Sequence, residues 1–197
     1  MALTSKEIND SIMNTFVISF PMSGLSINRI NICDKRDEYI VNRIGDYDVI
    51  ILAGGHVPTQ NSFFEKIRLK NHIKSFDGIL VAISAGTMNS AEIVYAQPEL
   101  RGEAIDQEYQ KFLHGLGITK LMILPHYQDL KDKVLDGKRL FEDITYPDSY
   151  GREFYALVDG SFFLIENGAT TLFGEAYLIN DGNIKQICEK DKSICIR

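Results

Sequence analysis

Ser84 is the residue whose surroundings in the sequence most strongly indicate catalysis. An apolar, β-branched run at 79–83 leads directly into Ser84-Ala85-Gly86, and a helical pattern follows. A strand that ends in x-Ser-x-Gly and turns at once into a helix predicts a nucleophile elbow, which lifts the serine Oγ above the sheet. The N–H of Ala85 would then face an oxyanion formed beside Ser84. The alternative is that Ser84 only caps the helix, as serine commonly does.

A pair of glycines follows another apolar run, residues 48–52, in the segment Ala53-Gly54-Gly55-His56. In open α/β sheets, ligands bind at the carboxyl ends of the parallel strands. Glycines there let backbone N–H groups face the ligand, so we expect Gly55 to supply the second oxyanion donor. A tight turn that needs a positive φ would explain the glycines equally well. The chain has neither a dinucleotide fingerprint nor a phosphate loop.

His126 is the strongest candidate for a general base among the four histidines. It comes just after the short apolar run 121–124, so its imidazole would lie at a strand end, where it could take the proton of a serine on a neighbouring strand. His72 falls in a polar helix and His114 in a glycine-rich loop, where surface roles are expected. His56 stays the second candidate, because it flanks the two glycines.

The elements that must position these residues follow from the hydrophobic pattern. Apolar runs alternate with amphipathic stretches as far as residue 126, which predicts a parallel sheet wrapped by helices. Strands are expected at 27–33, 48–52, 78–83 and 121–124, after a stub at 1–4, and helices at 6–20, 36–44, 58–74 and from 87 to 95. From residue 153, short alternating strands separated by Asp-Gly and Asn-Gly pairs predict β-hairpins that extend the same sheet.

Composition narrows the class of protein. With 197 residues, 45% hydrophobic and 24% charged, the chain is expected to form a single folded domain over residues 1–197. The net charge of −6 makes nucleic acid and membranes poor partners. The three scattered cysteines and the spacing of the histidines predict neither a disulfide scaffold nor a metal site. The first residues of the sequence show no signal-peptide pattern, which favours a cytoplasmic location for the protein.

Three segments, in this order, resemble the peptidase E (aspartyl dipeptidase) and cyanophycinase group of serine peptidases. They are Ala53-Gly54-Gly55, Ile83-Ser84-Ala85-Gly86 and Pro125-His126-Tyr127. The resemblance covers nearly the whole chain, including residues 154–161 and the hairpins after them. It implies a three-layer α/β fold that is flavodoxin-like, as in class I glutamine amidotransferases. Its mostly parallel central sheet would be flanked by helices and followed by C-terminal β-hairpins.

The same resemblance implies a Ser-His-acid triad. Ser84 would be the nucleophile and His126 the base, and the backbone N–H groups of Gly55 and Ala85 would form the oxyanion hole. The family's glutamate on the strand after the histidine aligns with Asp159, whose side chain is one methylene shorter.

The role of Asp159 has an alternative. Residues 158–161, Val-Asp-Gly-Ser, also form a good hairpin turn, in which the aspartate would make only a local backbone hydrogen bond. Glu92 and Glu99, downstream of the elbow, are the reserve carboxylates.

The expected function is therefore hydrolysis of small peptides, such as dipeptides, through an acyl-enzyme and without a cofactor. The expected partner is a small peptide substrate, and a homodimer is left open. A catalytically inactive or regulatory binding module with the same fold is the alternative, because folds often outlive their functions. Glutaminase chemistry ranks last, because the elbow carries serine and Cys33 does not lie on one.

Overall fold

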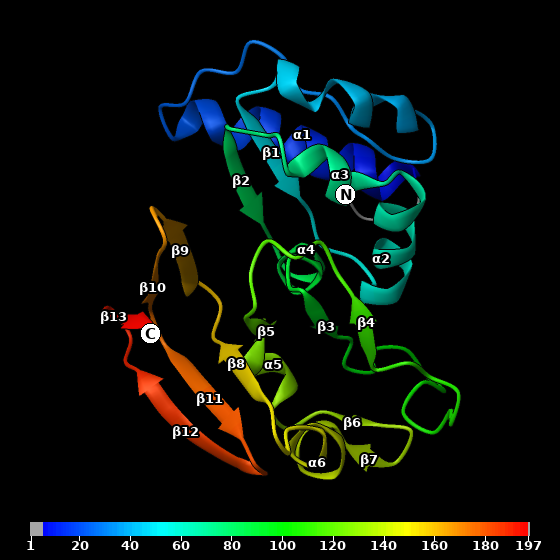
Figure 1. Ribbon diagram of the computed structural model, residues 1–197, viewed down its shortest axis with the longest axis vertical. Helices are drawn as coiled ribbons and strands as arrows, with labels where there is room; N and C mark the ends of the chain where they lie inside the picture. Colours follow the sequence, from blue (N-terminus) through cyan, green and yellow to red (C-terminus); the bar gives the residue numbers. More distant parts are fainter. Residues whose placement is uncertain (1–5, 197) are drawn as a thin grey trace. The chain divides into compact units, whose positions relative to one another are not determined.

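The computed structural model describes residues 6–196, which form a mixed α/β fold (Figure 1). The chain divides into two compact units, one ending at Ser90 and the other beginning at Ala91. Gly55, Ser84 and Ala85 belong to the first unit, whereas His126 and Asp159 belong to the second. Within the described range, no helix combines the length and the apolar character needed to cross a membrane.

The first unit contains a parallel pair of strands and several short helices. In chain order its elements are α1 (Lys6–Met22), the 3-10 helix η1 (Glu38–Asp46), β1 (Val49–Leu52), α2 (Val57–Lys66), α3 (Leu69–Ile73), β2 (Ile79–Ala82) and α4 (Ala85–Asn89). β1 pairs in parallel with β2, and the last pair in register is Leu52 with Ala82. Both strands therefore end at the same edge, and the segments that carry Gly55 and Ser84 begin there.

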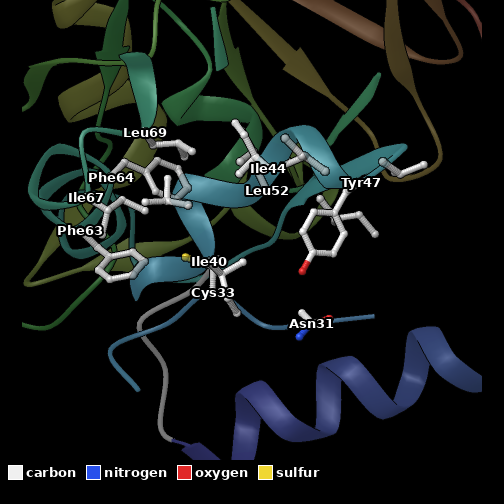
Figure 2. Close-up of a pocket in the computed structure, with 14 residues that line it drawn as sticks. Asn31, Cys33, Ile40, Ile44, Tyr47, Leu52, Phe63, Phe64, Ile67 and Leu69 are labelled. Carbon is white, nitrogen blue, oxygen red and sulfur yellow. The ribbon is translucent and has the colours of Figure 1, made fainter. Parts of the chain in front are cut away.

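An apolar pocket of about 100 Å³ lies in the first unit, lined mainly by β1, η1, α2 and α3. Figure 2 shows Phe63, Phe64 and Ile67 at one end of the pocket and Tyr47 at the other. Pockets that hold drug-sized ligands are larger, about 300–1,000 Å³. Cys33 also lines the pocket, and its burial raises the pKa of its thiol to about 11. A thiol that stays protonated is a poor nucleophile, which argues against cysteine chemistry here.

Gly86 sits where the start of α4 touches the end of β1. A Cβ added to this residue would lie 2.1 Å from the carbonyl oxygen of Leu52 and 2.6 Å from its carbonyl carbon. Both atoms belong to the backbone, so they cannot move aside as a side chain would. The residue after Ala85 must therefore be glycine for α4 to follow Ser84 at this distance from the sheet.

We expect Gly86→Ala to destabilise the fold by about 3 kcal/mol, because the added methyl group forces α4 away from β1. Urea unfolding followed by circular dichroism measures this change directly. Gly45→Ala is the matched control, because a Cβ at Gly45 would meet nothing within 4 Å. A Gly86→Ala midpoint equal to that of the control would contradict the close packing of α4 on β1.

Helix α1 is tied to the segment before η1 by a buried carboxylate, Asp34, which is 3% exposed. The Asn9 side-chain amide donates to Asp34 Oδ2 at 3.0 Å, and the Arg36 guanidinium donates to Asp34 at 2.6 Å and pairs with Asp10 on α1 at 2.8 Å. The hydrogen bonds from Arg36 hold the pKa of the Asp34 carboxyl at about 2, although burial opposes this shift.

Acid is therefore expected to weaken the attachment of α1. Because the pKa of Asp34 is lower in the folded state than its ordinary 3.8, the stabilisation is fully present above about pH 4 and is lost as the pH falls towards 2. Asp34→Asn should cost about 2 kcal/mol at neutral pH and flatten this part of the pH profile. Melting curves of both proteins between pH 2 and 7 test the prediction, which fails if the two profiles stay parallel.

The second unit is rich in strands, with short helices between them. Its elements are β3 (Ile93–Tyr95), β4 (Phe112–His114), β5 (Met122–Leu124), α5 (Tyr127–Leu130), β6 (Val134–Leu135), β7 (Lys138–Arg139), the π-helix η2 (Leu140–Thr145), α6 (Tyr146–Asp148), β8 (Glu153–Leu157), β9 (Phe162–Glu166), β10 (Ala169–Phe173), β11 (Ala176–Asn180), β12 (Asn183–Cys188) and β13 (Ser193–Ile196).

Two sheets of the second unit share one apolar core. One has the strand order β12-β11-β8-β5, and the other has the order β13-β10-β9. Both contribute to a cluster of buried residues: Ile123, Tyr155, Leu157, Leu172, Ala176 and Cys188. In the first of these sheets β5 and β8 are parallel, whereas the other pairs are antiparallel. This parallel pair positions the two candidate residues of the second unit.

The hairpin predicted at Asp159-Gly160 does not form, because β8 and β9 lie in different sheets. The other two predicted hairpins are confirmed, because β9 pairs antiparallel with β10 and β11 with β12. They turn at Asn167-Gly168 and Asp181-Gly182, where all four residues have positive φ. The expectation that the late strands all extend one sheet is wrong, since β9, β10 and β13 form a separate sheet. Parallel pairing is confirmed for β1 with β2 and for β5 with β8. A single central sheet stays a prediction.

Three expected elements differ in the structure. Residues 27–33 take no strand assignment, because alternation sets the faces of a strand but does not provide the neighbour that completes it. The helix expected at 58–74 is broken at Arg68, whose φ of 52° is left-handed. The helix expected from 87 to 95 ends at Asn89, and β-branched Ile93 and Val94 enter β3 instead. The stub at 1–4 lies outside the described residues.

Candidate active site

Ser84 occupies the sharp turn between β2 and α4. Its backbone has a φ of 52° and a ψ of −118°, a combination that is rare for a residue with a Cβ and that is concentrated at functional sites. The Gly86 N–H donates to the Ile83 carbonyl at 2.9 Å, and the Thr87 N–H donates to the Ser84 carbonyl at 2.9 Å. Strand thus passes into helix without a loop. The Ser84 hydroxyl makes no capping bond to α4, so the capping interpretation lacks its defining contact.

The glycine loop after β1 lies against Ser84. A Cβ added to Gly54 would lie 3.2 Å from the Ser84 Cβ and 3.5 Å from its Oγ, so a side chain at this position would crowd the serine. Gly55 has a φ of 144°, in the range that L side chains rarely adopt. The turn therefore needs glycine at position 55, one residue after the Gly54 that lies against Ser84.

His126 and Asp159 form a direct hydrogen bond, with 2.7 Å between His126 Nδ1 and Asp159 Oδ1. They are neighbours because β5 and β8 are parallel, with Leu124 opposite Ala156, and each residue comes shortly after the carboxyl end of its strand. His126 has a φ of 61° and a ψ of 32° at the start of α5, a region that histidine enters more often than most residues. With the Nδ1 proton directed at the carboxylate, Nε2 carries the lone pair that a general base needs.

The sequence matches the family model Peptidase_S51, described as "Peptidase family S51", over residues 2–173. The chain belongs to peptidase family S51. This membership supports a serine peptidase in general terms. The structure is also similar to the crystal structure of a candidate peptidase E protein from Listeria monocytogenes EGD-e, with 15% sequence identity, a TM-score of 0.48, and coverage of 85% of this chain and 72% of that chain. A search of curated proteins found no match to the sequence.

In this S51 chain the turn that carries Asp159 is held by α5. The Asp159 N–H donates to the Gln128 side-chain oxygen at 3.0 Å, and the Ser161 N–H donates to the Val158 carbonyl at 3.0 Å. Asp159 therefore lies in a tight turn between β8 and β9, but these strands belong to different sheets and form no hairpin, and the Asp159 carboxylate also bonds to His126, as the other interpretation predicted. The two descriptions are compatible because the backbone forms the turn while the carboxylate stays available to the imidazole.

Among the described residues of this S51 peptidase, His126, Asp129 and Asp159 form a group that could hold a metal ion. Within the described range their ligand atoms lie within 4.8 Å of one another. One imidazole and two carboxylates would suit a divalent transition metal. The His126–Asp159 hydrogen bond occupies Nδ1, so a metal ligated through that nitrogen would displace the hydrogen bond that orients the imidazole.

His56, the second candidate for the base of the S51 site, stands at the start of α2. Its Nδ1 lies 2.7 Å from the Thr59 hydroxyl, a contact with the first turn of the helix that the residue precedes. His126 contacts the Asp159 carboxylate, whose negative charge would stabilise the imidazolium formed during catalysis.

Sequence reasoning missed three polar residues that contact the candidate segments of this S51 chain: Gln60 and Asn89 in the first unit, and Gln128 in the second. Gln60 and Asn89 are both 0% exposed. Gln60 shares the buried face of α2 with Phe63 and Phe64, and a polar residue on an apolar helical face is a recognisable signal. Gln128 is half-buried and gives no comparable signal in the sequence.

Proposed function

We propose that this chain is a serine-type hydrolase of small peptides in which Ser84 is the nucleophile and His126 the general base. The observation that carries the proposal is the 2.7 Å hydrogen bond between His126 and Asp159. A histidine by itself has two interchangeable tautomers, whereas one that donates Nδ1–H to a carboxylate presents Nε2 for proton transfer. The rare backbone conformation of Ser84 at the end of β2 supports its assignment as a nucleophile on an elbow.

The proposed reaction has two stages. Ser84 Oγ attacks the scissile carbonyl carbon while its proton passes to His126 Nε2, and the carbonyl oxygen becomes an oxyanion. The N–H groups of Gly55 and Ala85 donate to that oxyanion. His126 then gives the proton to the leaving amine as the C–N bond breaks, which leaves an ester between Ser84 and the acyl part of the substrate. Water, deprotonated by His126, hydrolyses this ester and restores the serine.

Asp159 accepts the Nδ1–H of His126 throughout the proposed cycle. Its side chain is 55% exposed and that of His126 is 40% exposed, so solvent screens their interaction. Orientation of the imidazole is therefore its main contribution, and charge stabilisation is the smaller one.

We also propose a more detailed fold for the chain than a mixed α/β arrangement. It is a single three-layer domain over residues 1–197, like the class I glutamine amidotransferases, with one mostly parallel sheet. The parallel pairs β1–β2 and β5–β8 support it. The proposed substrates are dipeptides and similar short peptides, with N-terminal aspartyl members first among them, and the proposed site of action is the cytoplasm.

A fluorophosphonate probe tests the proposal, because it phosphonylates serines that a base has activated. We expect one adduct per chain, mapped by peptide mass spectrometry to Ser84, and loss of hydrolysis of a dipeptide panel in proportion to labelling. The panel contains aspartyl and isoaspartyl dipeptides beside neutral and basic ones. A folded protein that takes up no probe and hydrolyses no member of the panel would instead be a binding module.

A further inference from the structure

We propose that Gln60 and Asn89 are positioning residues that hold the Gly54–Gly55 loop in register with the Ser84 turn. This inference rests on the proposed function and extends it to residues that never touch the substrate. Both side chains are amides with 0% exposure. Burial of two amides in a small unit is unfavourable unless their hydrogen bonds are satisfied, so the contacts that these amides make indicate what they are for.

The contacts form a chain of hydrogen bonds from the loop to α4. Gln60 Nε2 donates to the Ala53 carbonyl at 2.6 Å. Asn89 Nδ2 donates to Gln60 Oε1 at 3.0 Å and to the Val57 carbonyl at 3.2 Å. Asn61 Nδ2 in turn donates to Asn89 Oδ1 at 3.0 Å. The acceptors Ala53 and Val57 are the residues that immediately flank the loop formed by Gly54, Gly55 and His56.

Hydrogen bonds therefore hold both ends of the loop. Asn89 bonds directly to Val57 at one end, and it bonds through Gln60 to Ala53 at the other. Asn89 is the last residue of α4, the helix that begins directly after Ser84. Gly54, within the loop, lies against Ser84: a Cβ added to this glycine would be 3.2 Å from the Ser84 Cβ. The amides therefore link the segment that would donate to the oxyanion with the helix that carries the nucleophile.

This link matters because oxyanion donors act only at short range. They need to lie about 2.7–3.1 Å from the developing charge, and displacement of a catalytic group by about 1 Å can lower a rate by about 10²-fold. Glycines alone would leave the loop mobile, since they have the widest choice of backbone conformations. The hydrogen bonds of Gln60 and Asn89 restrict this loop, whose two glycines otherwise allow many backbone conformations.

The double variant Gln60→Met, Asn89→Leu tests the inference. It removes both amides and keeps apolar side chains of similar size, which limits the loss of packing. Because the Ala53 carbonyl loses a donor and the Asn61 amide loses an acceptor, the melting temperature is measured beside the kinetics. We expect kcat for the best dipeptide of the panel to fall about 10- to 100-fold, with KM within about threefold of the parent. The rate of phosphonylation of Ser84 should fall in parallel.

Hydrogen exchange supplies a readout that does not depend on activity. Exchange of the amides of residues 54–56 should become faster in the double variant, while those of β1 and β2 keep the parental protection. Ser62→Ala is the matched control on the same helix, because the Ser62 hydroxyl only donates to the Pro58 carbonyl on the exposed side of α2. This control should match the parent in kcat, in phosphonylation and in exchange.

The outcomes separate the two proposals. A folded, active double variant with parental kcat overturns the positioning role alone, as does slow exchange at 54–56. Loss of activity that merely follows a lowered Tm, with exchange raised throughout the first unit, also overturns it in favour of a general structural role. An unreactive parent overturns the proposed function and, with it, the catalytic part of this inference.

Discussion

Ser84→Ala is expected to lower kcat/KM for dipeptide hydrolysis by at least about 10⁴-fold, because removal of the nucleophile of a serine hydrolase leaves only the catalysis that comes from binding and the oxyanion hole. The variant should be folded, since alanine is smaller than serine and the hydroxyl makes no capping bond to α4. It should also take up no fluorophosphonate. Steady-state kinetics on the panel, intact-mass analysis and a melting curve together check these three expectations.

Ser75→Ala provides the control for this substitution. The Ser75 hydroxyl donates to the His72 carbonyl on an exposed part of the first unit, so its removal should leave activity and labelling at parental values. Hydrolysis by Ser84→Ala at more than a tenth of the parental rate would exclude Ser84 as the nucleophile. An adduct mapped to another serine would identify its replacement.

Asp159→Asn is expected to lower kcat by about 10²- to 10³-fold with little change in KM. An asparagine at this position can present its NH₂ group to Nδ1, which favours the wrong tautomer of His126, and in a buried triad this change costs about 10⁴-fold. The smaller figure follows from the 55% exposure of the Asp159 side chain, since water can substitute for part of its role. The pH dependence of kcat and the melting temperature should be measured together.

Asp129→Asn is the matched control, because it makes the same chemical change in the same cluster. Asp129 accepts from Gln128 Nε2 at 3.2 Å and has no role in the proposed cycle, so its replacement should change kcat by less than about threefold. Equal effects of the two substitutions would show that net charge around His126, and not the hydrogen bond from Asp159, supports the reaction. Activity retained by Asp159→Asn would return Glu92 and Glu99 to consideration.

The sequence was most informative where a residue type and a strand end coincide. Ser84, Gly55 and His126 were singled out because each follows an apolar run, and the parallel pairs β1–β2 and β5–β8 explain why such positions gather at sheet edges. Asp159 required the resemblance to a family, because its own segment fits an ordinary hairpin turn. The structure shows a tight turn at this segment, without a hairpin, together with the contact between Asp159 and His126.

Other features had no signal that a single sequence could carry. The left-handed φ of Arg68, which splits the predicted helix at 58–74, depends on tertiary packing and not on local propensity. Residues 27–33 have the alternation of a strand but no strand assignment, so pattern alone was misleading there. Asn89 looks like an ordinary polar residue of a helix until its burial is known, whereas Gln60 could have been singled out as a polar residue on the apolar face of α2.

The backbone of Ser84 has a consequence for how this chain can change over evolutionary time. A serine held at a φ of 52° and a ψ of −118° lowers the stability of the fold by about 1–3 kcal/mol, a penalty that glycine largely escapes. Selection for stability alone would therefore favour glycine at this position. A homologue that had lost catalytic activity would become more stable through that single replacement. One under selection for hydrolysis must retain the less stable serine.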